Sequence, residues 1–219
     1  MSSANVEEYI EALYRLGAAE KPVGTGELAE SMGVVAPSVT TMLKRLVRDG
    51  LVTHVPYKGI VLTEAGKAMS MSLVRRHRLS ERLLTDMIHV PWDRVHDAAC
   101  KLEHVITGEL EEDVYNALGR PETCPHGYPV DAVESGPRPS LADVPVGVEA
   151  EVVMVSEEPA EFLRYVSEIG LAPGASVKVI GRAPLGDVMT FERDGKTWTI
   201  GRDVAARIWV AVAEEQADS

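Results

Sequence analysis

The sequence predicts a mainly helical protein that ends in a small β domain, and three observations support this fold class. Apolar residues recur at helical spacing through most of the first 118 residues. Six prolines and four glycines then interrupt residues 119–147, where neither a helical nor a strand period continues. Short alternating apolar runs fill residues 148–213, which is typical of β-strands. We therefore expect a helical part, a linker and a β part, in that order.

The composition fits a cytoplasmic globular protein of two or three small domains. The chain has 219 residues, and its hydrophobic share of 45% is ordinary for a folded protein. No apolar run approaches the roughly 20 residues that a membrane helix needs, and no basic-then-apolar leader is present, so we expect no membrane partner. Both cysteines, Cys100 and Cys124, lie near histidines, so thiols available to a metal are favoured over a disulfide framework.

The charge of the chain is distributed unevenly. The net charge of −12 argues against a nucleic-acid binder when it is taken as a whole. Residues 21–82, however, contain ten Lys or Arg against five Asp or Glu, and the rest of the chain contains 12 against 29. This asymmetry is compatible with a DNA-binding part joined to an acidic regulatory part. Without a supporting motif, a solvated basic helix face would be the simpler interpretation.

The first 50 residues predict three helices in the order of a helix-turn-helix. Residues 6–17 have apolar positions at a helical period. TGELAESMG predicts a short second helix with Thr25 as its N-cap and Gly33 after its end. APSVTTMLKRLVRDG predicts a third helix with Pro37 at its first position and Gly50 after its end.

A predicted hairpin completes a winged helix-turn-helix. The β-rich runs LVTHV and GIVLT are joined by residues 56–59, which form the turn of the wing. The third helix would then enter the DNA major groove. Short hydroxyls near its beginning suit base edges and phosphates, and the basic side chains suit phosphates. The candidate DNA-binding residues are Pro37, Ser38, Thr40, Thr41, Lys44, Arg48 and Lys58.

Two helical runs separated at Val90-Pro91 concentrate metal-ligating side chains. The first run carries a His and a Glu four residues apart. The second carries four ligand-type residues at spacings of four, three and one, which predicts one stripe on a helix. The six residues are His77, Glu81, His96, Cys100, Glu103 and His104. Imidazole, carboxylate and thiolate together are the ligand set of a divalent transition metal. Any one of them alone is more often a satisfied polar group, but six within about thirty residues predict a metal site.

Weaker candidates lie on the first helix and in the linker. Glu8 and Glu11 are three residues apart on one face, although Glu8 can simply close a cap on Asn5 and Glu11 can be a solvated charge. Cys124 and His126 lie two apart in Cys-Pro-His-Gly, a turn that can carry any polar residue. Neither pair establishes a ligand without support.

The last third of the chain predicts five short strands and one helix. The strands lie in VEAEVVMVS, ASVKVIG, DVMTFE, TWTIG and RIWVAVA, and residues 161–169 fit the helix. Asp194-Gly195 marks a hairpin. Five short strands in this length suggest a small β-barrel.

VRRHRLSERLL, VHDAACKLEHVI and PSVTTMLKRLVRDGLV closely resemble the DtxR/MntR family of metal-dependent repressors. The resemblance covers residues 6–131 strongly and extends more loosely to a C-terminal SH3-like, FeoA-like domain. It implies a winged-helix domain (1–72), a helical metal-binding and dimerisation domain (73–130), a linker (131–147) and the FeoA-like domain (148–219). It further implies a homodimer, Mn(II) or Fe(II) as corepressor, and repression of metal-uptake genes through a palindromic DNA operator.

By position, the resemblance implies two metal sites. His77, Glu81 and His96 match one site, to which Glu158 and Glu161 of SEEPAEF would lend ligands, and Cys124 and His126 match a Cys-Pro-His turn that manganese sensors add there. Glu8, Cys100, Glu103 and His104 match the second, regulatory site, and Glu11 matches a ligand of some manganese sensors.

The sequence leaves alternatives for the identity of the metal and for the class of function. Iron sensors place a methionine at the position of Glu8, and manganese sensors commonly place a carboxylate at that of Cys100. We expect Mn(II), because Glu8 supplies a hard oxygen, with Fe(II) as the alternative. A zinc hydrolase is a remote alternative, since neither a His-Glu-x-x-His run nor a phosphate loop occurs. A metal-storage or delivery module would leave the winged helix unexplained.

Overall fold

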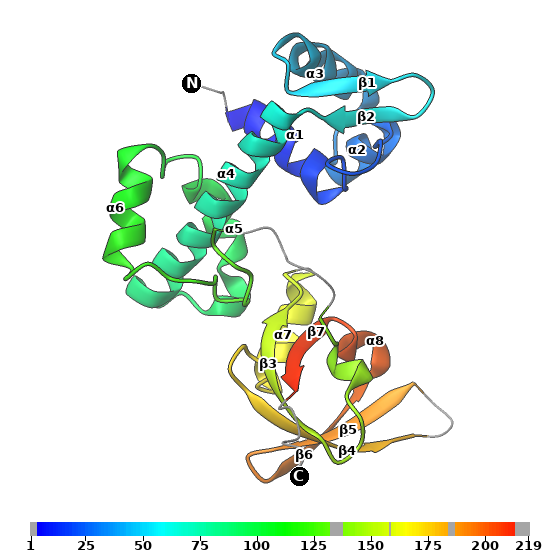
Figure 1. The fold of residues 1–219 in the computed structure, drawn as a ribbon, viewed down its shortest axis with the longest axis vertical. Coiled ribbons are helices and arrows are strands. Elements are labelled where there is room, and N and C mark those ends of the chain that lie inside the picture. The colour runs from blue at the N-terminus through cyan, green and yellow to red at the C-terminus, as the bar shows by residue number, and fades with distance from the viewer. Residues whose placement is uncertain (1–3, 132–137, 158, 184–186, 213–219) are drawn as a thin grey trace, which may run out of the picture. The chain divides into compact units, whose positions relative to one another are not determined.

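The computed structural model describes residues 4–131, 138–157, 159–183 and 187–212. The chain divides into two compact units (Figure 1). The first unit contains residues 1–77 and 103–107, and the second contains residues 78–102 and 108–219. None of the helices in the described ranges is both long and apolar enough to cross a membrane.

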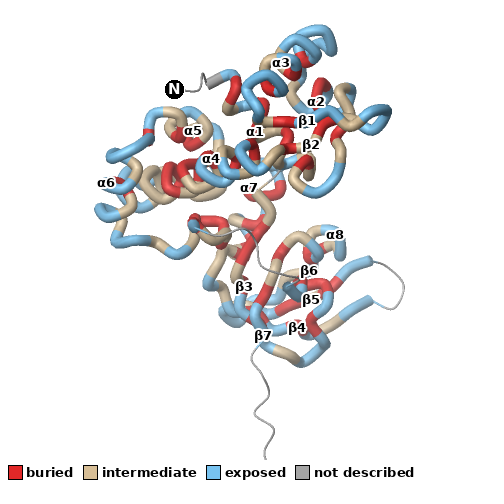
Figure 2. The backbone as a smooth tube through the Cα atoms, turned by 45° about the horizontal axis from the view of Figure 1, so that its top comes forward, coloured by how far each residue is buried: buried red, intermediate tan, exposed pale blue. Residues whose placement is uncertain are grey.

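The first unit has the predicted winged-helix order. Its helices α1 (Ala4–Arg15), α2 (Thr25–Ser31) and α3 (Ala36–Arg48) precede a two-stranded antiparallel sheet. The strands β1 (Val52–Val55) and β2 (Gly59–Leu62) form the wing. The three helices pack their inner faces together with the wing, where the burial colouring of Figure 2 is red, because their apolar residues recur every three to four positions.

The prediction that Thr25 caps α2 is wrong. Gly24 occupies the N-cap position, with φ −72° and ψ 146°, and Thr25 is the first helical residue. Gly24 has no side chain that could bond to the first turn of this helix. The helix therefore begins one residue earlier than the sequence predicts.

Helix α4 (Glu64–Arg82) begins in the first unit, and its residues from Arg78 onward belong to the second. It continues as a π-helical turn, η1 (Leu83–Met87). After the predicted break, Pro91 leads into a 3-10 turn, η2 (Trp92–Arg94), and helix α5 (His96–Leu102) follows. Helix α6 (Glu109–Ala117) completes the helical part.

The expected single stripe of ligands on α5 is shorter than the sequence predicts. The helix ends at Leu102, so Glu103 and His104 lie in the turn that follows it. Part of the reason is that the Glu103 carbonyl accepts a hydrogen bond from Arg76 Nη1 at 3.1 Å. A side-chain donor thus satisfies a carbonyl at the end of the helix.

Five antiparallel strands form the sheet of the second unit in the order β6-β5-β4-β3-β7. They are β3 (Glu149–Val155), β4 (Ser176–Arg182), β5 (Val188–Arg193), β6 (Lys196–Gly201) and β7 (Ile208–Val212). These strands match the five predicted runs. The β5–β6 connection is the predicted hairpin, since both of its residues have positive φ, 51° at Asp194 and 72° at Gly195.

Three short helices accompany the sheet: η3 (Leu141–Asp143), α7 (Ala160–Glu168) and α8 (Arg202–Ala205). Buried residues of η3 and α7 join the strands in one apolar core. Part of the stretch that the sequence suggests as a linker therefore packs into this core, through η3. A capping box between Ser140 and Asp143 fixes that turn, with the Ser140 hydroxyl 2.6 Å from Asp143 Oδ2.

Candidate metal centres and nucleic-acid interface

Three ligand-type side chains of the first unit converge, and we call them the Glu103 cluster: Glu11, His77 and Glu103. One potential ligand atom from each lies within 4.8 Å of the others. His77 Nδ1 is 2.6 Å from Glu103 Oε2. Both side chains are almost fully buried, at 4% and 1% exposure, while Glu11 is half-buried. Two carboxylates and an imidazole are thus held together away from bulk water.

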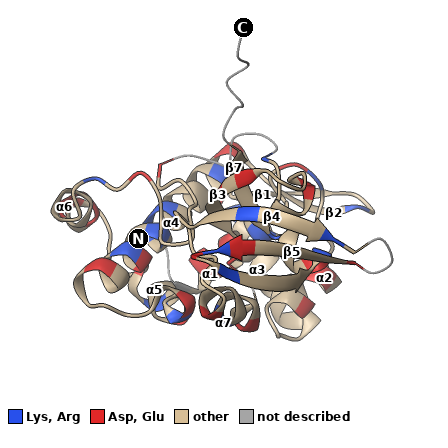
Figure 3. Ribbon diagram, turned by 90° about the horizontal axis from the view of Figure 1, so that it is seen from below, with Lys and Arg blue, Asp and Glu red and all other residues tan. Residues whose placement is uncertain are grey.

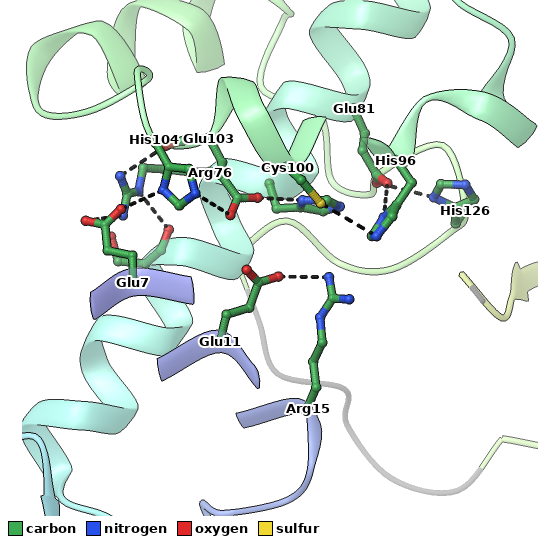
Figure 4. A network of polar contacts seen from close by, with 12 residues as sticks. Glu7, Glu11, Arg15, Arg76, Glu81, His96, Cys100, Glu103, His104 and His126 are labelled. Atoms are coloured by element: carbon green, nitrogen blue, oxygen red, sulfur yellow. Dashed lines mark hydrogen bonds and ion pairs between the residues drawn. The ribbon is translucent and has the colours of Figure 1, made fainter. Parts of the chain in front are cut away.

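The cluster extends to a second carboxylate-imidazole pair. Glu7 Oε2 lies 2.8 Å from His104 Nδ1, and His104 Nε2 lies 3.7 Å from Glu103 Oε1. Figure 4 shows Glu7 and Glu11 projecting from α1, and their spacing of four residues places them on one helix face. Glu8, the predicted ligand on this helix, has an exposed side chain and stays a prediction.

The residues of the Glu103 cluster fit a divalent metal ion. Glu103 Oε1 is buried and makes no hydrogen bond to any residue in the described ranges, an arrangement that costs free energy unless a cation or donor serves the oxygen. Burial raises the pKa of Glu11, and the negative charge of Glu103 adds to the rise, against the opposing effects of Arg15 and His77. Carboxylates that crowd each other in this way favour a bound cation.

A second group lies in the second unit, and we call it the His126 cluster: Glu81, Cys124, His126 and Glu157. Its potential ligand atoms also lie within 4.8 Å of one another. His126 Nδ1 is 3.2 Å from Glu81 Oε2 and 3.9 Å from Cys124 Sγ. His126 Nε2 lies 3.0 Å from the carbonyl oxygen of Trp92, which can only accept, so the proton belongs on Nε2 and Nδ1 can serve a metal.

The electrostatics of the His126 cluster depend on burial and on its two carboxylates. Burial raises the pKa of the Cys124 thiol well above its usual range, and the charges of Glu81 and Glu157 raise it further. Burial alone would lower the pKa of His126, but the hydrogen bond and charge of Glu81 outweigh it and raise that pKa. A metal ion here must displace these protons, and it would hold a thiolate and a neutral imidazole.

Two arginines of α4 hold the loop that carries Cys124 and His126. Arg82 Nε donates to the carbonyl of Thr123 at 2.6 Å, and Arg82 Nη2 donates to that of Cys124 at 3.3 Å. Arg78 Nη1 donates to the carbonyl of Pro129 at 2.5 Å. The loop also needs Gly127, which has φ 92° and an α-carbon so close to β3 that a Cβ would lie 2.0 Å from a backbone oxygen.

His96 and Cys100 contact each other one turn apart on α5, with Cys100 Sγ 3.6 Å from His96 Nε2. His96 Nδ1 lies 3.8 Å from Glu81 Oε1, so two of the three residues assigned to one site by resemblance are neighbours. The third, His77, belongs to the first unit, and its place in that site stays a prediction.

The two carboxylates expected from the FeoA-like domain stay predictions. Glu158 lies outside the described residues, and Glu161 is exposed on α7. Their neighbour Glu157 belongs to the His126 cluster. Sequence reasoning missed Glu157 and also Glu7. For Glu7 the signal was its spacing of four from Glu11, whereas for Glu157 the stretch SEEP offers adjacent carboxylates with no period to choose between them.

Helix α3 presents the predicted DNA-binding face. Val39, Leu43 and Leu46 are buried, so the positions between them point outward. The candidate residues are all exposed: Pro37, Ser38, Thr40, Thr41, Lys44 and Arg48 on α3, and Lys58 on the wing. The Thr40 and Thr41 hydroxyls donate to backbone carbonyls four residues earlier at 3.0 Å, which leaves their oxygen lone pairs outward as acceptors. Figure 3 shows where basic and acidic residues lie on each element.

Three family models match the chain in succession. The N-terminal DNA binding domain of iron dependent repressors matches residues 1–60. The metal binding and dimerisation domain of iron dependent repressors matches residues 63–131. The FeoA domain matches residues 140–212.

In sequence, the chain is 30% identical over 189 residues to the iron-dependent repressor IdeR of Mycobacterium tuberculosis (strain ATCC 25618 / H37Rv), covering 79% of this chain and 82% of that repressor. The chain belongs to the DtxR/IdeR family of metal-dependent repressors. It is also 27% identical over 217 residues to the diphtheria toxin repressor of Corynebacterium diphtheriae, covering 92% of this chain and 94% of that protein.

Solved structures of the DtxR/IdeR family have the same fold. One described as a manganese-dependent transcriptional repressor in complex with manganese is 29% identical, with a TM-score of 0.79, and the match covers 95% of this chain and all of that one. The manganese regulator SloR is 26% identical, with a TM-score of 0.73 and 97% of this chain covered. The chain is therefore a metal-dependent DNA-binding repressor with Mn or Fe as its metal, a homodimer on operator DNA, and not an enzyme.

Proposed function

We propose that this protein is a cytoplasmic repressor of metal-uptake genes that Mn(II) activates for binding to a palindromic operator. The single observation that carries the choice of metal is the donor set of the Glu103 cluster. With the neighbouring Glu7 and His104, the cluster offers three carboxylates and two imidazoles. Oxygen-rich sets suit Mn(II), while softer ligands favour other metals of the series.

Fe(II) is the second candidate, and specific observations favour it. The relative IdeR is named as an iron-dependent repressor, although the solved structures include manganese regulators. Cys100, in contact with His96, is a soft donor. Affinity alone does not separate the two ions, because Fe(II) binds most sites of this kind more tightly than Mn(II). The relevant quantity is activation at the free-metal concentrations that the cell maintains.

The mechanism we propose depends on which segments supply the ligands. Glu7 and Glu11 belong to α1 of the winged helix, His77 belongs to α4, and Glu103 and His104 belong to the turn after α5. A bound divalent ion supplies the positive charge that lets these carboxylates remain ionised side by side. These segments would then hold α1 at a fixed distance from α4, and α3 shares one apolar core with α1.

Fixing these segments matters because a dimer reads two half-sites. Two recognition helices must lie about 34 Å apart to enter successive major grooves. If about 1% of the repressor has that spacing without metal, raising the fraction to about 99% needs roughly 5.5 kcal/mol of preferential metal binding. The exposed threonines of α3 would then read bases, and Lys44, Arg48 and Lys58 would contact phosphates.

The His126 cluster is proposed as a second metal site. Glu81, Cys124, His126 and Glu157 would hold the ion, with His96 adjacent to Glu81. In our proposal this site secures the Cys124 loop between α4 and β3. Its thiolate makes it the softer of the two centres.

The proposed function is tested by a mobility shift on a promoter palindrome with and without Mn(II). We expect a shift only with metal, and we expect Glu103→Gln to remove the metal response because it removes a charged ligand and leaves the volume unchanged. Glu168→Gln is the matched control, since it neutralises an exposed glutamate of the second unit that is not a candidate ligand. Equal shifts with and without metal in the wild type would refute the coupling.

A further inference from the structure

A buried arginine lies against the Glu103 cluster, and neither metal centre uses it as a ligand. Arg76 is only 5% exposed, next to His77 on α4. Its Nη2 lies 3.6 Å from Glu7 Oε1, and its Nη1 donates to the carbonyl oxygen of Glu103 at 3.1 Å. The guanidinium therefore contacts one carboxylate beside the cluster and the backbone of a residue within it.

The charge on Arg76 is permanent, because a guanidinium does not lose its proton in a protein. It is also poorly screened, since both members of the Arg76–Glu7 pair are largely buried, with side-chain exposures of 6% and 14%. A divalent ion bound by Glu11, His77 and Glu103 would lie near this charge, because Arg76 contacts the backbone of Glu103 and the carboxylate of Glu7. The two positive charges would repel each other, and Arg76 would hold Glu7 away from the ion.

We propose that Arg76 is an affinity-setting residue, whose fixed positive charge weakens metal binding at the Glu103 cluster and so raises the free-metal concentration at which the repressor responds. The inference rests on the proposed metal centre. The physical basis is that the Arg76 guanidinium lies beside the proposed metal site and competes with the metal ion for Glu7. It is also too buried to be screened by salt. A repressor needs such a limit, because a site that is always filled cannot report a change in metal supply.

Two substitutions at the same position separate charge from structure. Arg76→Gln removes the charge and keeps a donor for the Glu103 carbonyl, whereas Arg76→Lys keeps the charge. For charges of +1 and +2 a few ångströms apart at a protein's effective dielectric constant, neutralisation should tighten binding at least about tenfold. Arg76→Lys should bind within about threefold of the parent. Lys67→Gln on the same helix is the charge-matched control, because Lys67 pairs with the exposed Glu64 and should have no effect.

The readout is the dissociation constant of Mn(II), measured without DNA from the electron paramagnetic resonance signal of unbound Mn(II). Every protein in the series carries His126→Gln, so that the His126 cluster does not contribute. Folding is checked by circular dichroism, and Arg76→Met serves as a second neutral variant, since its stem fills the same apolar volume.

The outcomes are distinct. Tighter Mn(II) binding by the folded neutral variants, with Arg76→Lys near the parent, supports the inference. Unchanged or weaker binding by the neutral variants overturns it, and so does equal tightening by Arg76→Lys. Loss of folding in both neutral variants also overturns it, because Arg76 would then be a structural residue. If the parent itself fails to bind Mn(II), the proposed metal centre is refuted rather than the role of Arg76 alone.

Discussion

Arg82 provides a direct test of how the protein positions its second metal centre. Its guanidinium makes three hydrogen bonds to the loop, to the Thr123 carbonyl at 2.6 Å and to the Thr123 hydroxyl and the Cys124 carbonyl at 3.3 Å each. Arg82→Met keeps most of the apolar stem and removes all three. The cluster residues themselves remain, so any change in metal affinity reports their positioning.

The size of the effect follows from these contacts. A hydrogen bond from a charged donor contributes roughly 1.5–3 kcal/mol. The side chain of Arg82 is 27% exposed and two of the bonds are long, so water replaces part of the loss. We expect Arg82→Met to weaken metal binding at the His126 cluster by about 2 kcal/mol in total. Because each 1.4 kcal/mol is tenfold in a binding constant, metal affinity at the His126 cluster should fall roughly 30-fold.

The assay uses Co(II), whose thiolate charge-transfer absorption reports ligation by a cysteine. A Cys100→Ser background leaves Cys124 as the thiol that is observed. Arg120→Met is the matched control, because Arg120 is exposed and bonds to residues of its own helix-end region, Asn116 at 2.9 Å and Glu112 at 3.5 Å. Co(II) affinity in Arg82→Met equal to that in Arg120→Met would refute the positioning role. Faster amide exchange at Gly127, whose N–H bonds to the Cys124 carbonyl, should accompany the loss.

Three further predictions concern protons, a cap and the DNA face. Because the pKa of His126 is raised in the folded chain, His126 should stabilise the metal-free protein fully below pH 6.5, and this stabilisation should disappear as the pH rises through the raised value. Urea unfolding at several pH values should show this loss of stability in the parent protein. His126→Gln should not show it. Hydrogen bonds from Ser140 lower the pKa of Asp143, so Asp143→Ala should cost about 0.5–1 kcal/mol of stability in neutral solution, and thermal melts should show that difference shrinking as the pH falls below 3.8. Lys44→Ala should weaken binding to all DNA sequences and reduce the salt slope by about one, whereas Thr41→Ala should change base preference at constant slope; the reverse pattern in fluorescence anisotropy would show that these roles are misassigned.

Sequence patterns predict the helices and strands whose hydrophobic residues recur at a clear period. The winged helix follows from helical periods in three segments and a β-rich hairpin. The sheet domain follows from short alternating runs and the Asp194-Gly195 turn. Each of these signals is local, because the burial of one face of an element imposes a period on its own residues.

The metal ligands are harder to predict, because adjacent residues of the same type differ only in the direction in which their side chains point. Glu7 and Glu8 are neighbours on α1, about 100° apart around the helix, and only tertiary packing decides that Glu7 reaches His104. Glu103 lies outside the helix that its spacing predicts. Its carbonyl oxygen accepts a hydrogen bond from Arg76, a residue 27 positions earlier in the chain. Glu157 joins the His126 cluster through a contact with residues more than 30 positions away, which no local pattern encodes.

The central claim is that Mn(II) at cellular concentrations activates operator binding through the Glu103 cluster. The most direct test is the half-maximal free-metal concentration for operator binding, measured in metal buffers by fluorescence anisotropy, with an oxygen-free arm for Fe(II). We expect Mn(II) to activate the wild type within its available range and Glu103→Gln to require at least 100-fold more. We also expect Glu8→Met to shift the response toward Fe(II). Full activation by Fe(II) alone, with no effect of Glu8→Met, would contradict the claim and make the protein an iron regulator.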